Sequence, residues 1–195
     1  NSPSTPLPVM RRLMHAASLA MRAPRGLARE ATMLGGVPAL KLVPRNTDGA
    51  RHLLYLHGGA YIIGSPQGHS SLAGQLGAAA NMTVWSLDYR LAPEHPYPAA
   101  EQDALAAFRA LLDQGIAAQD IAIAGDSAGG GLALATALAI RDAGLPVPAA
   151  LALLSPWADL TLSGRSMIDK LDIEPMLTPG WLEWAADAYC GVHGE

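Results

Sequence analysis

The sequence predicts an α/β protein in which helices cover both faces of a mainly parallel sheet. Short apolar segments of strand length alternate with longer helical segments along the middle of the chain. This alternation is typical of parallel sheets, because each crossover between parallel strands needs a helix. Hydrophobic residues make up 50% of the 195 residues and charged residues 15%. This length and composition favour one domain with a substantial buried core.

Strands are expected where the chain is predominantly apolar over four to six residues. They are predicted near Ala31–Leu34, Ala39–Val43, Leu53–Leu56, Thr83–Asp88, Ile121–Ala124 and Ala149–Leu154. Helices are predicted over Pro98–Gln114, Ser127–Ala143 and, less regularly, Pro66–Ala80. Gly115 and Gly144 end the first two of these helices, since glycine readily adopts the left-handed conformation that follows a helix.

Residues 7–23 form a predicted amphipathic helix at the start of the chain. Met10, Met14, Ala17 and Met21 have the spacing of one helix face. The pair Arg11-Arg12 followed by an apolar stretch also fits a twin-arginine export signal, but the periodicity favours the helix. The methionines are expected to fill the core or to line a pocket for an acyl chain, because thioethers adapt to variable shapes.

The alternation of predicted strands and helices changes after Pro156. Thr161–Pro175 is expected to be irregular. Thr178 and Pro179 then offer an N-cap and a first-turn proline for a helix that runs to Tyr189. Trp181 and Trp184 are expected to pack against neighbouring elements.

Gly125-Asp126-Ser127-Ala128-Gly129 places a serine at a predicted turn from strand to helix. This pattern is typical of a nucleophile elbow, in which the sharp turn exposes the serine hydroxyl. Such a turn brings neighbouring atoms close together, so glycine is needed on both sides. Ser127 is therefore the predicted nucleophile, and Asp126 is expected to have a positioning role.

The glycine loop His57-Gly58-Gly59-Ala60 follows the predicted strand Leu53–Leu56. Acyl transfer needs hydrogen-bond donors for the oxyanion that develops on the substrate. Backbone N–H groups after the nucleophile and after an early strand supply these donors in serine hydrolases with such an elbow. The predicted oxyanion hole consists of Gly58, Gly59 and Ala128.

The chain resembles the bacterial hormone-sensitive lipase family of α/β-hydrolases. Four segments carry the resemblance in the family's order: His57–Ala60, Asp88–Ala100, Gly125–Gly130 and Ser155–Leu160. The resemblance implies an α/β-hydrolase fold with a helical cap, and a serine carboxylesterase with lipase-like character that acts on small-molecule esters of short to medium acyl chains. By the resemblance, residues 1–30 are the N-terminal cap helix, 31–160 the first part of the core and 161–195 a second cap segment.

The expected catalytic acid and histidine have no clear place in the chain. Both partners follow the serine in an α/β-hydrolase, and His193 near the end is the one histidine after Ser127. His57, His69 and His95 precede the nucleophile and match loops of the family. We therefore expect the acid and the histidine beyond Glu195, little activity from this chain alone, and C-terminal strands of the fold missing from it.

The apolar segment Ala149–Leu154 is then expected to be an unpaired sheet edge, and such edges recruit other chains. The isolated chain is expected to aggregate, to form a homodimer through this edge or to occur with a partner fragment that carries the missing residues.

The net charge, the lengths of the apolar stretches and the cysteine content argue against several classes of protein. A net charge of −4 without long charged runs argues against a nucleic-acid partner. No apolar stretch reaches the length of a membrane span. Cys190 is the only cysteine, which is compatible with a cytoplasmic protein without disulfides. No His or Cys cluster has metal-ligand spacing, and no cofactor is expected. The alternative function is that of a non-catalytic protein that binds a small ligand on the same scaffold.

Overall fold

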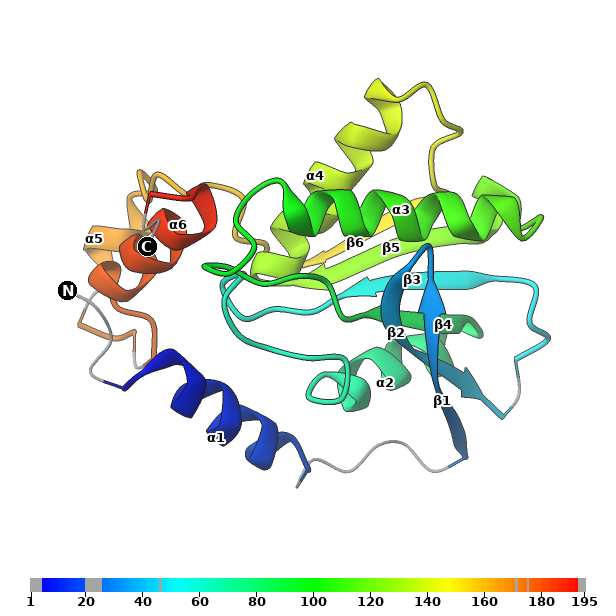
Figure 1. Cartoon of the computed structure of the whole chain (residues 1–195), viewed down its shortest axis with the longest axis horizontal. Helices are drawn as coiled ribbons and strands as arrows, with labels where there is room; N and C mark the ends of the chain where they lie inside the picture. Colours follow the sequence, from blue (N-terminus) through cyan, green and yellow to red (C-terminus); the bar gives the residue numbers. More distant parts are fainter. Residues whose placement is uncertain (1–4, 20–25, 46, 171, 175, 193–195) are drawn as a thin grey trace.

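The computed structural model describes residues 5–19, 26–45, 47–170, 172–174 and 176–192. The described residues contain a six-stranded sheet with the strand order β1-β2-β4-β3-β5-β6 (Figure 1). The strands are β1 (Leu27–Leu34), β2 (Val37–Pro44), β3 (His52–Leu56), β4 (Thr83–Leu87), β5 (Ile121–Asp126) and β6 (Ala150–Leu154). Pairs β1–β2 and β2–β4 are antiparallel, whereas β3 pairs in parallel with β4 and β5, and β5 with β6. The predicted α/β class with a mainly parallel sheet is confirmed.

The predicted strands lie close to the observed ones, and β1 shows the largest difference. It begins at Leu27, four residues before the predicted start at Ala31, and it includes the exposed residues Arg29 and Glu30. β1 is an edge strand of the sheet. Edge strands tolerate exposed charges because only one side pairs, so this strand lacks the apolar run by which the others were predicted.

The described helices are α1 (Leu7–Leu19), α2 (Ser70–Ala80), α3 (Ala99–Asp113), α4 (Ala128–Asp142), α5 (Ser166–Asp169), α6 (Pro179–Cys190) and the 3₁₀ turn η1 (Ala118–Asp120). The helix α5 was not predicted, because the segment 161–175 was expected to be irregular. It is one turn long, and the Arg165 Nε atom lies 3.2 Å from Asp169 Oδ2 across it. Thr178 is the N-cap of α6, as predicted, and its side chain accepts a hydrogen bond from the Trp181 N–H.

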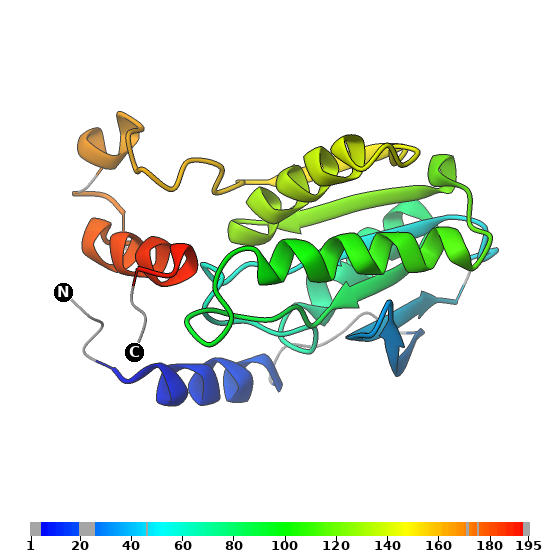
Figure 2. The same cartoon turned by 45° about the horizontal axis from the view of Figure 1, so that its top comes forward.

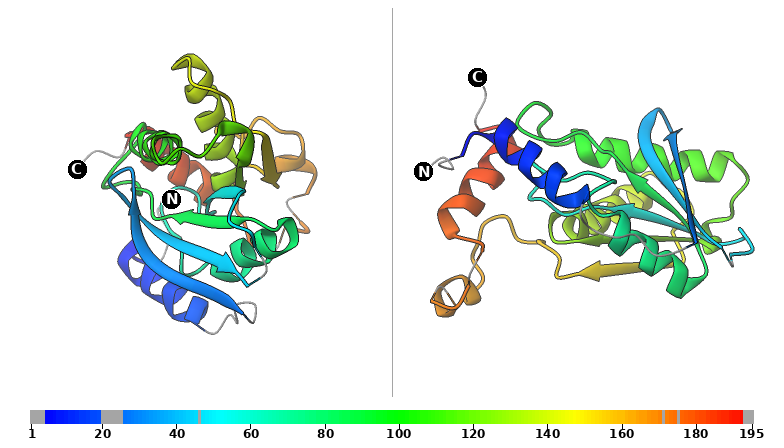
Figure 3. Two further views of the ribbon diagram at one scale, coloured as in Figure 1. Left: turned by 90° about the vertical axis from the view of Figure 1, so that its right-hand side faces the viewer. Right: turned by 90° about the horizontal axis from the view of Figure 1, so that it is seen from below.

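Helices cover both faces of the sheet (Figures 1 and 3). On one face α3 and α4 pack over a large apolar core that includes Phe108, Ile123 and Leu132. On the other face α2 covers a smaller core around Tyr55 and Val84. Burial on both sides explains why β3 is apolar along nearly its whole length, and β4 is buried throughout.

The helices α1, α5 and α6 gather at the end of the sheet toward which the parallel strands β3, β5 and β6 point (Figures 2 and 3). Ligands of open α/β sheets bind outside the carboxyl ends of the strands, so these helices lie over the expected place of a site. The predicted division into cap and core at residues 30 and 160 remains a prediction.

The helix α1 is attached to two loops of the core through one side chain. The Arg11 guanidinium donates to the Ile62 and Ala92 carbonyl oxygens, each at 2.8 Å, and to the Glu94 carboxylate at 2.7 Å. Arg11 therefore lies in a helix and connects it to the core. Met21, which belongs to the predicted apolar face of this helix, lies outside the described residues.

The helix α6 is attached through Tyr189. Its ring stacks on Tyr61 with centroids 3.9 Å apart. The Tyr189 carbonyl oxygen accepts a hydrogen bond from the Tyr97 N–H at 2.7 Å. Together, Arg11 and Tyr189 hold α1 and α6 against the loops that follow β3 and β4.

Candidate active site

Ser127 lies at the turn between β5 and α4 with backbone angles φ 53° and ψ −122°. Non-glycine residues rarely adopt a positive φ, and such strain persists only where the surroundings hold it. Three backbone hydrogen bonds do so here. The Ser127 N–H donates to the Leu154 carbonyl oxygen at 2.9 Å, and the Ser127 carbonyl oxygen accepts from Trp157 at 2.8 Å and Gly131 at 3.1 Å. The local geometry is that of the predicted elbow.

Glycines on both sides of Ser127 allow α4 to approach the sheet. A Cβ atom on Gly125 would collide with the Gly129 backbone, and one on Gly129 would collide with the backbone of Leu56 and His57. The elbow therefore packs directly against the end of β3, where the glycine loop begins.

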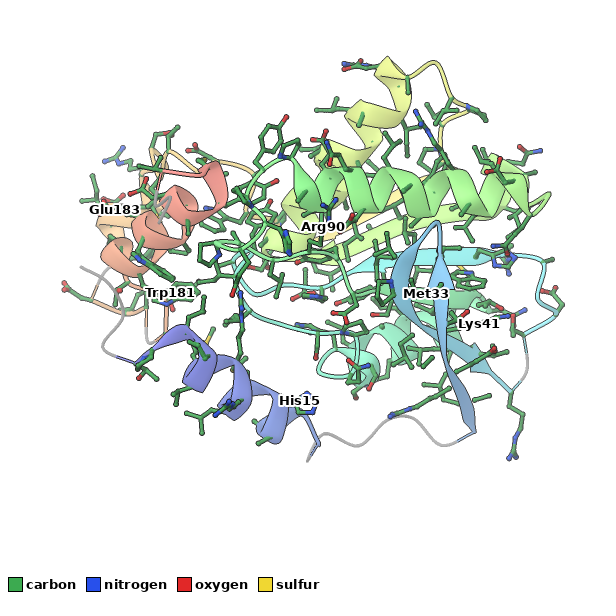
Figure 4. All side chains as sticks on the ribbon, in the orientation of Figure 1. His15, Met33, Lys41, Arg90, Trp181 and Glu183 are labelled. Atoms are coloured by element: carbon green, nitrogen blue, oxygen red, sulfur yellow. The ribbon has the colours of Figure 1, made fainter. Side chains whose placement is uncertain are left out.

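A cavity of about 710 Å³ lies between this elbow and the helices α1 and α6. Ser127, Gly58 and Gly59 line one side of it. The other side is lined by Met10 and Met14 of α1 and by Trp181 and Leu182 of α6, together with Trp157. Figure 4 shows Trp181 on the side of α6 that faces α1. The lining is mostly apolar, which suits the acyl or alkyl part of a small ligand.

The glycine loop is anchored by Asp126, the residue before the predicted nucleophile. Its Oδ1 atom accepts a hydrogen bond from the Gly58 N–H at 2.9 Å and another from the Tyr55 hydroxyl at 2.5 Å. Burial and the hydrogen bond to Asp126 raise the pKa of Tyr55, so this hydroxyl stays protonated and remains a donor. Asp126 thus connects β3, β5 and the glycine loop.

This hydrogen bond changes the interpretation of Gly58. The sequence suggested that Gly58 donates to the substrate, but its N–H already donates to Asp126. The N–H groups of Gly59, Ala60 and Ala128 make no hydrogen bond to another described residue. Ala60 has a φ of 52°, and Ala128 is the first residue of α4, where N–H groups lack partners within the helix.

The glycines of the loop are required by packing within the protein. A Cβ on Gly58 would collide with the Asp126 carboxylate, and one on Gly59 would collide with the Ile63 carbonyl group. Gly59 also has a φ of 127°, which side chains rarely allow.

His57 is fully buried beside this loop. Its ring stacks on Tyr89, with centroids 4.4 Å apart, and on His69 at 5.2 Å. Its Nδ1 atom lies 2.8 Å from the Gly58 carbonyl oxygen, and its Nε2 atom has no hydrogen-bond partner among the described residues. Burial, with a smaller effect of His69, lowers the pKa of His57 to about 4. His57 is therefore neutral near pH 7 and supports the loop.

The other histidines have different surroundings. His69 lines the cavity, whereas His95 is exposed in the proline-rich loop and His193 lies outside the described residues. Two charged residues of the loop after β4 have partners from other elements. Arg90 binds Asp103 of α3 at 2.7 Å, and Glu94 binds Arg11 of α1.

No pattern in the sequence indicates that the side chains of Tyr55 and Arg11 hold the elements around the site together. Tyr55 reads as one more buried residue of a strand, and Arg11 as part of a charged helix face. Their partners lie 71 and 83 residues away in the chain, and no local pattern indicates such pairs.

The chain was compared with protein families and with known proteins. Residues 53–195 match a family model described as alpha/beta hydrolase fold. An acetyl-hydrolase of Streptomyces hygroscopicus is 50% identical over 146 residues, which are 75% of this chain and 48% of that protein. A putative acetyl-hydrolase, LipR, of Mycobacterium tuberculosis is 44% identical over 165 residues, 84% of this chain and 53% of that protein. The chain thus spans about half the length of these curated relatives.

Solved structures give the same result. A crystal structure of EstE5 soaked with ethyl alcohol superimposes with a TM-score of 0.93 at 41% identity, covering 98% of this chain and 64% of that one. A hormone-sensitive lipase from a metagenome library has a TM-score of 0.93 at 45% identity, covering 99% of this chain and 64% of that chain. The resemblance on which the sequence analysis relied is therefore confirmed by sequence and by structure.

Proposed function

We propose that this chain, which belongs to the α/β-hydrolase family, carries the nucleophile and the oxyanion donors of a carboxylic ester hydrolase. The observation that carries this proposal is the position of Ser127. A strained elbow holds it at the wall of an apolar cavity that Gly59 also lines. Strain of this kind has a stability cost, and it is concentrated at functional sites.

In the proposed mechanism the Ser127 hydroxyl attacks the carbonyl carbon of the ester. A bond forms between Oγ and this carbon, the general base takes the hydroxyl proton, and the carbonyl electrons move to the oxygen. The N–H groups of Gly59, Ala60 and Ala128 stabilise this oxyanion. The electrons then return to the carbonyl, the bond between this carbon and the alcohol oxygen breaks, and the base gives its proton to the alcohol. In a second step of the same kind, a water molecule attacks the acyl carbon, the bond to Oγ breaks, and the acid leaves. Gly58, which donates to Asp126, holds the loop in place.

The general base and its acid are proposed to lie beyond Glu195. No hydrogen bond joins the Ser127 hydroxyl to another residue that the structure describes. The one histidine among the described lining residues of the cavity is His69, whose Nδ1 faces the Ser65 carbonyl oxygen at 3.1 Å. This chain alone is therefore expected to have little activity.

The proposed substrates are small-molecule esters with short to medium acyl chains. The cavity of about 710 Å³ has room for such a molecule, and its methionine and tryptophan side chains suit an apolar group. The names of the relatives support small esters, since they include acetyl-hydrolases and an ethyl acetate hydrolase of Pseudomonas putida that is 38% identical over 149 residues.

The alternative is a protein of the same fold that binds a small ligand without cleaving it. The apolar cavity serves such a role as well. A binding protein has no need of a strained serine beside unpartnered N–H groups, and these features favour catalysis. The part of the chain that the structure describes has no helix long and apolar enough to cross a bilayer. The cytoplasmic location remains a prediction.

Hydrolysis of p-nitrophenyl butyrate by the whole protein tests this proposal. Ser127→Ala is expected to lower kcat by several orders of magnitude, on the order of 10⁴ or more, because the covalent route is lost. Ser70→Ala, which removes a hydroxyl at the start of α2, serves as the control and is expected to keep kcat. Normal turnover by Ser127→Ala, or no hydrolysis of any ester by the unmodified protein, would refute the proposal.

A further inference from the structure

His69 stands at the N-terminal end of α2, beside the loop that holds the proposed oxyanion donors. Its Nε2 atom lies 3.8 Å from Asp126 Oδ2, and its Nδ1 atom lies 3.1 Å from the Ser65 carbonyl oxygen. Its ring stacks on His57 with an interplanar angle of 22°. The ring is thus fixed from three directions, although it is partly exposed to the cavity.

Both nitrogens of the His69 ring face oxygen acceptors. The Ser65 carbonyl is on one side and the Asp126 carboxylate is on the other. Nδ1 lies within hydrogen-bond distance of the Ser65 carbonyl oxygen, and Nε2 lies in the range of an ion-pair contact with the carboxylate. The second oxygen of Asp126 already accepts from Tyr55 and Gly58. His69 therefore completes the surroundings of a carboxylate whose orientation decides the position of the Gly58 amide.

His69 also lines a second cavity. This cavity, of about 580 Å³, lies next to α1 and α2 and is lined by Arg11, His15 and Leu72 among others. His69, Met14 and Gly64 line both cavities. The Asp126 side chain is 23% exposed beside the imidazole ring, so loss of the ring would open more of the carboxylate to water, which competes for its hydrogen bonds.

We propose that His69 is a positioning residue that orients Asp126 and, through Asp126, keeps the glycine loop in the geometry that directs the Gly59 N–H toward the substrate oxygen. This inference rests on the proposed function for its catalytic consequence. Its structural part, the dependence of the Gly58 to Asp126 hydrogen bond on His69, stands by itself.

Three variants distinguish the effect of the His69 nitrogen atoms from the effect of the size of its side chain. His69→Phe keeps a ring that stacks on His57 but removes both nitrogens. His69→Gln keeps an N–H donor on a side chain of similar reach. His95→Phe makes the same change at an exposed histidine outside the site and is the matched control.

The first measurement is hydrogen exchange of the Gly58 amide in the whole protein, followed by NMR. We expect exchange about tenfold faster in His69→Phe, close to the unmodified rate in His69→Gln and unchanged in His95→Phe, because exchange reports local opening of this hydrogen bond. An unchanged Gly58 amide in His69→Phe overturns the proposal, whether or not the protein hydrolyses esters.

The second measurement is the separation of kcat from KM in the whole protein. We expect His69→Phe to lower kcat about tenfold with little change in KM, since oxyanion donors act mainly in the transition state. His69→Gln should restore most of kcat. Equal losses in both variants, accompanied by equal losses of thermal stability, would assign His69 a merely structural role. If the unmodified protein has no Ser127-dependent hydrolysis, the proposed function fails, and the exchange result still decides the structural part.

Discussion

A single hydrogen bond determines which N–H groups beside Ser127 remain without a partner among the described residues. The Gly58 amide donates to Asp126, and this one hydrogen bond moves the proposed oxyanion hole from Gly58 to Gly59, Ala60 and Ala128. Neighbours in the chain do not indicate the pair, because 68 residues separate Gly58 from Asp126. The sequence predicts the turn at Ser127 and the glycine loop after β3, but only the packing of β3 beside β5 shows that the Gly58 N–H is already engaged.

His57 makes stability depend on pH. Its pKa is about 4 in the folded protein because the ring is buried, against about 6.5 in an unfolded chain. The unfolded chain therefore binds this proton first as the pH falls. The contribution of His57 to the free energy of unfolding is fully present above pH 6.5 and is lost as the pH falls toward 4. The loss is about 1.4 kcal/mol per pH unit.

Urea unfolding at pH 6.5 and pH 5.5 measures this dependence. His57→Gln is expected to be less stable at both values but to show a smaller difference between them. His95→Gln, an exposed control, should keep the difference found in the unmodified chain. An identical difference in His57→Gln would show that another group causes the pH dependence.

Among the elements, most helices and strands follow from local signals. Thr178 and Pro179 start α6 as expected, and the apolar runs predict β3, β4, β5 and β6 to within about two residues at each end. β1 and α5 do not have such signals. β1 is an exposed edge strand, and α5 is a single turn held by a surface ion pair. No local signal predicted how α1 and α6 contact the rest of the fold, because these contacts depend on single side chains that reach distant loops.

The contact of α1 with the core depends on Arg11. Its guanidinium binds Ile62, Ala92 and Glu94, and it holds the pKa of the Glu94 carboxyl below its usual range. Arg11→Met is expected to speed hydrogen exchange of the α1 amides about tenfold, because the helix loses its bonds to both loops.

Arg12→Met is the matched control, since Arg12 is the exposed neighbour on the same helix. Exchange measured by mass spectrometry on the peptide that contains α1 distinguishes the two variants. Equal acceleration in both would mean that Arg11 has no special part in holding α1.

At the scale of the whole molecule, β6 forms one edge of the sheet that the structure describes. Leu151 of β6 is 39% exposed, and Leu138 of the adjoining helix α4 is 45% exposed. Apolar edges with free backbone groups pair with other chains. The chain of 195 residues is therefore expected to self-associate in solution.

A charge on this edge should reduce the association. Leu151→Lys is expected to shift light scattering toward the monomer, whereas Ile173→Lys adds the same charge at a site that is 71% exposed and outside the sheet, and should have no effect. A stable monomer of the unmodified chain, or an equal effect of both variants, would contradict the role of β6.

The central claim is that Ser127 is the nucleophile of an ester hydrolase. Labelling of the whole protein with a fluorophosphonate, followed by mass spectrometry of its peptides, tests this claim most directly, because the reagent bonds covalently to an activated serine. We predict one adduct, on the peptide that contains Ser127, and none in Ser127→Ala. An adduct on another serine, or labelling that persists in Ser127→Ala, would contradict the account.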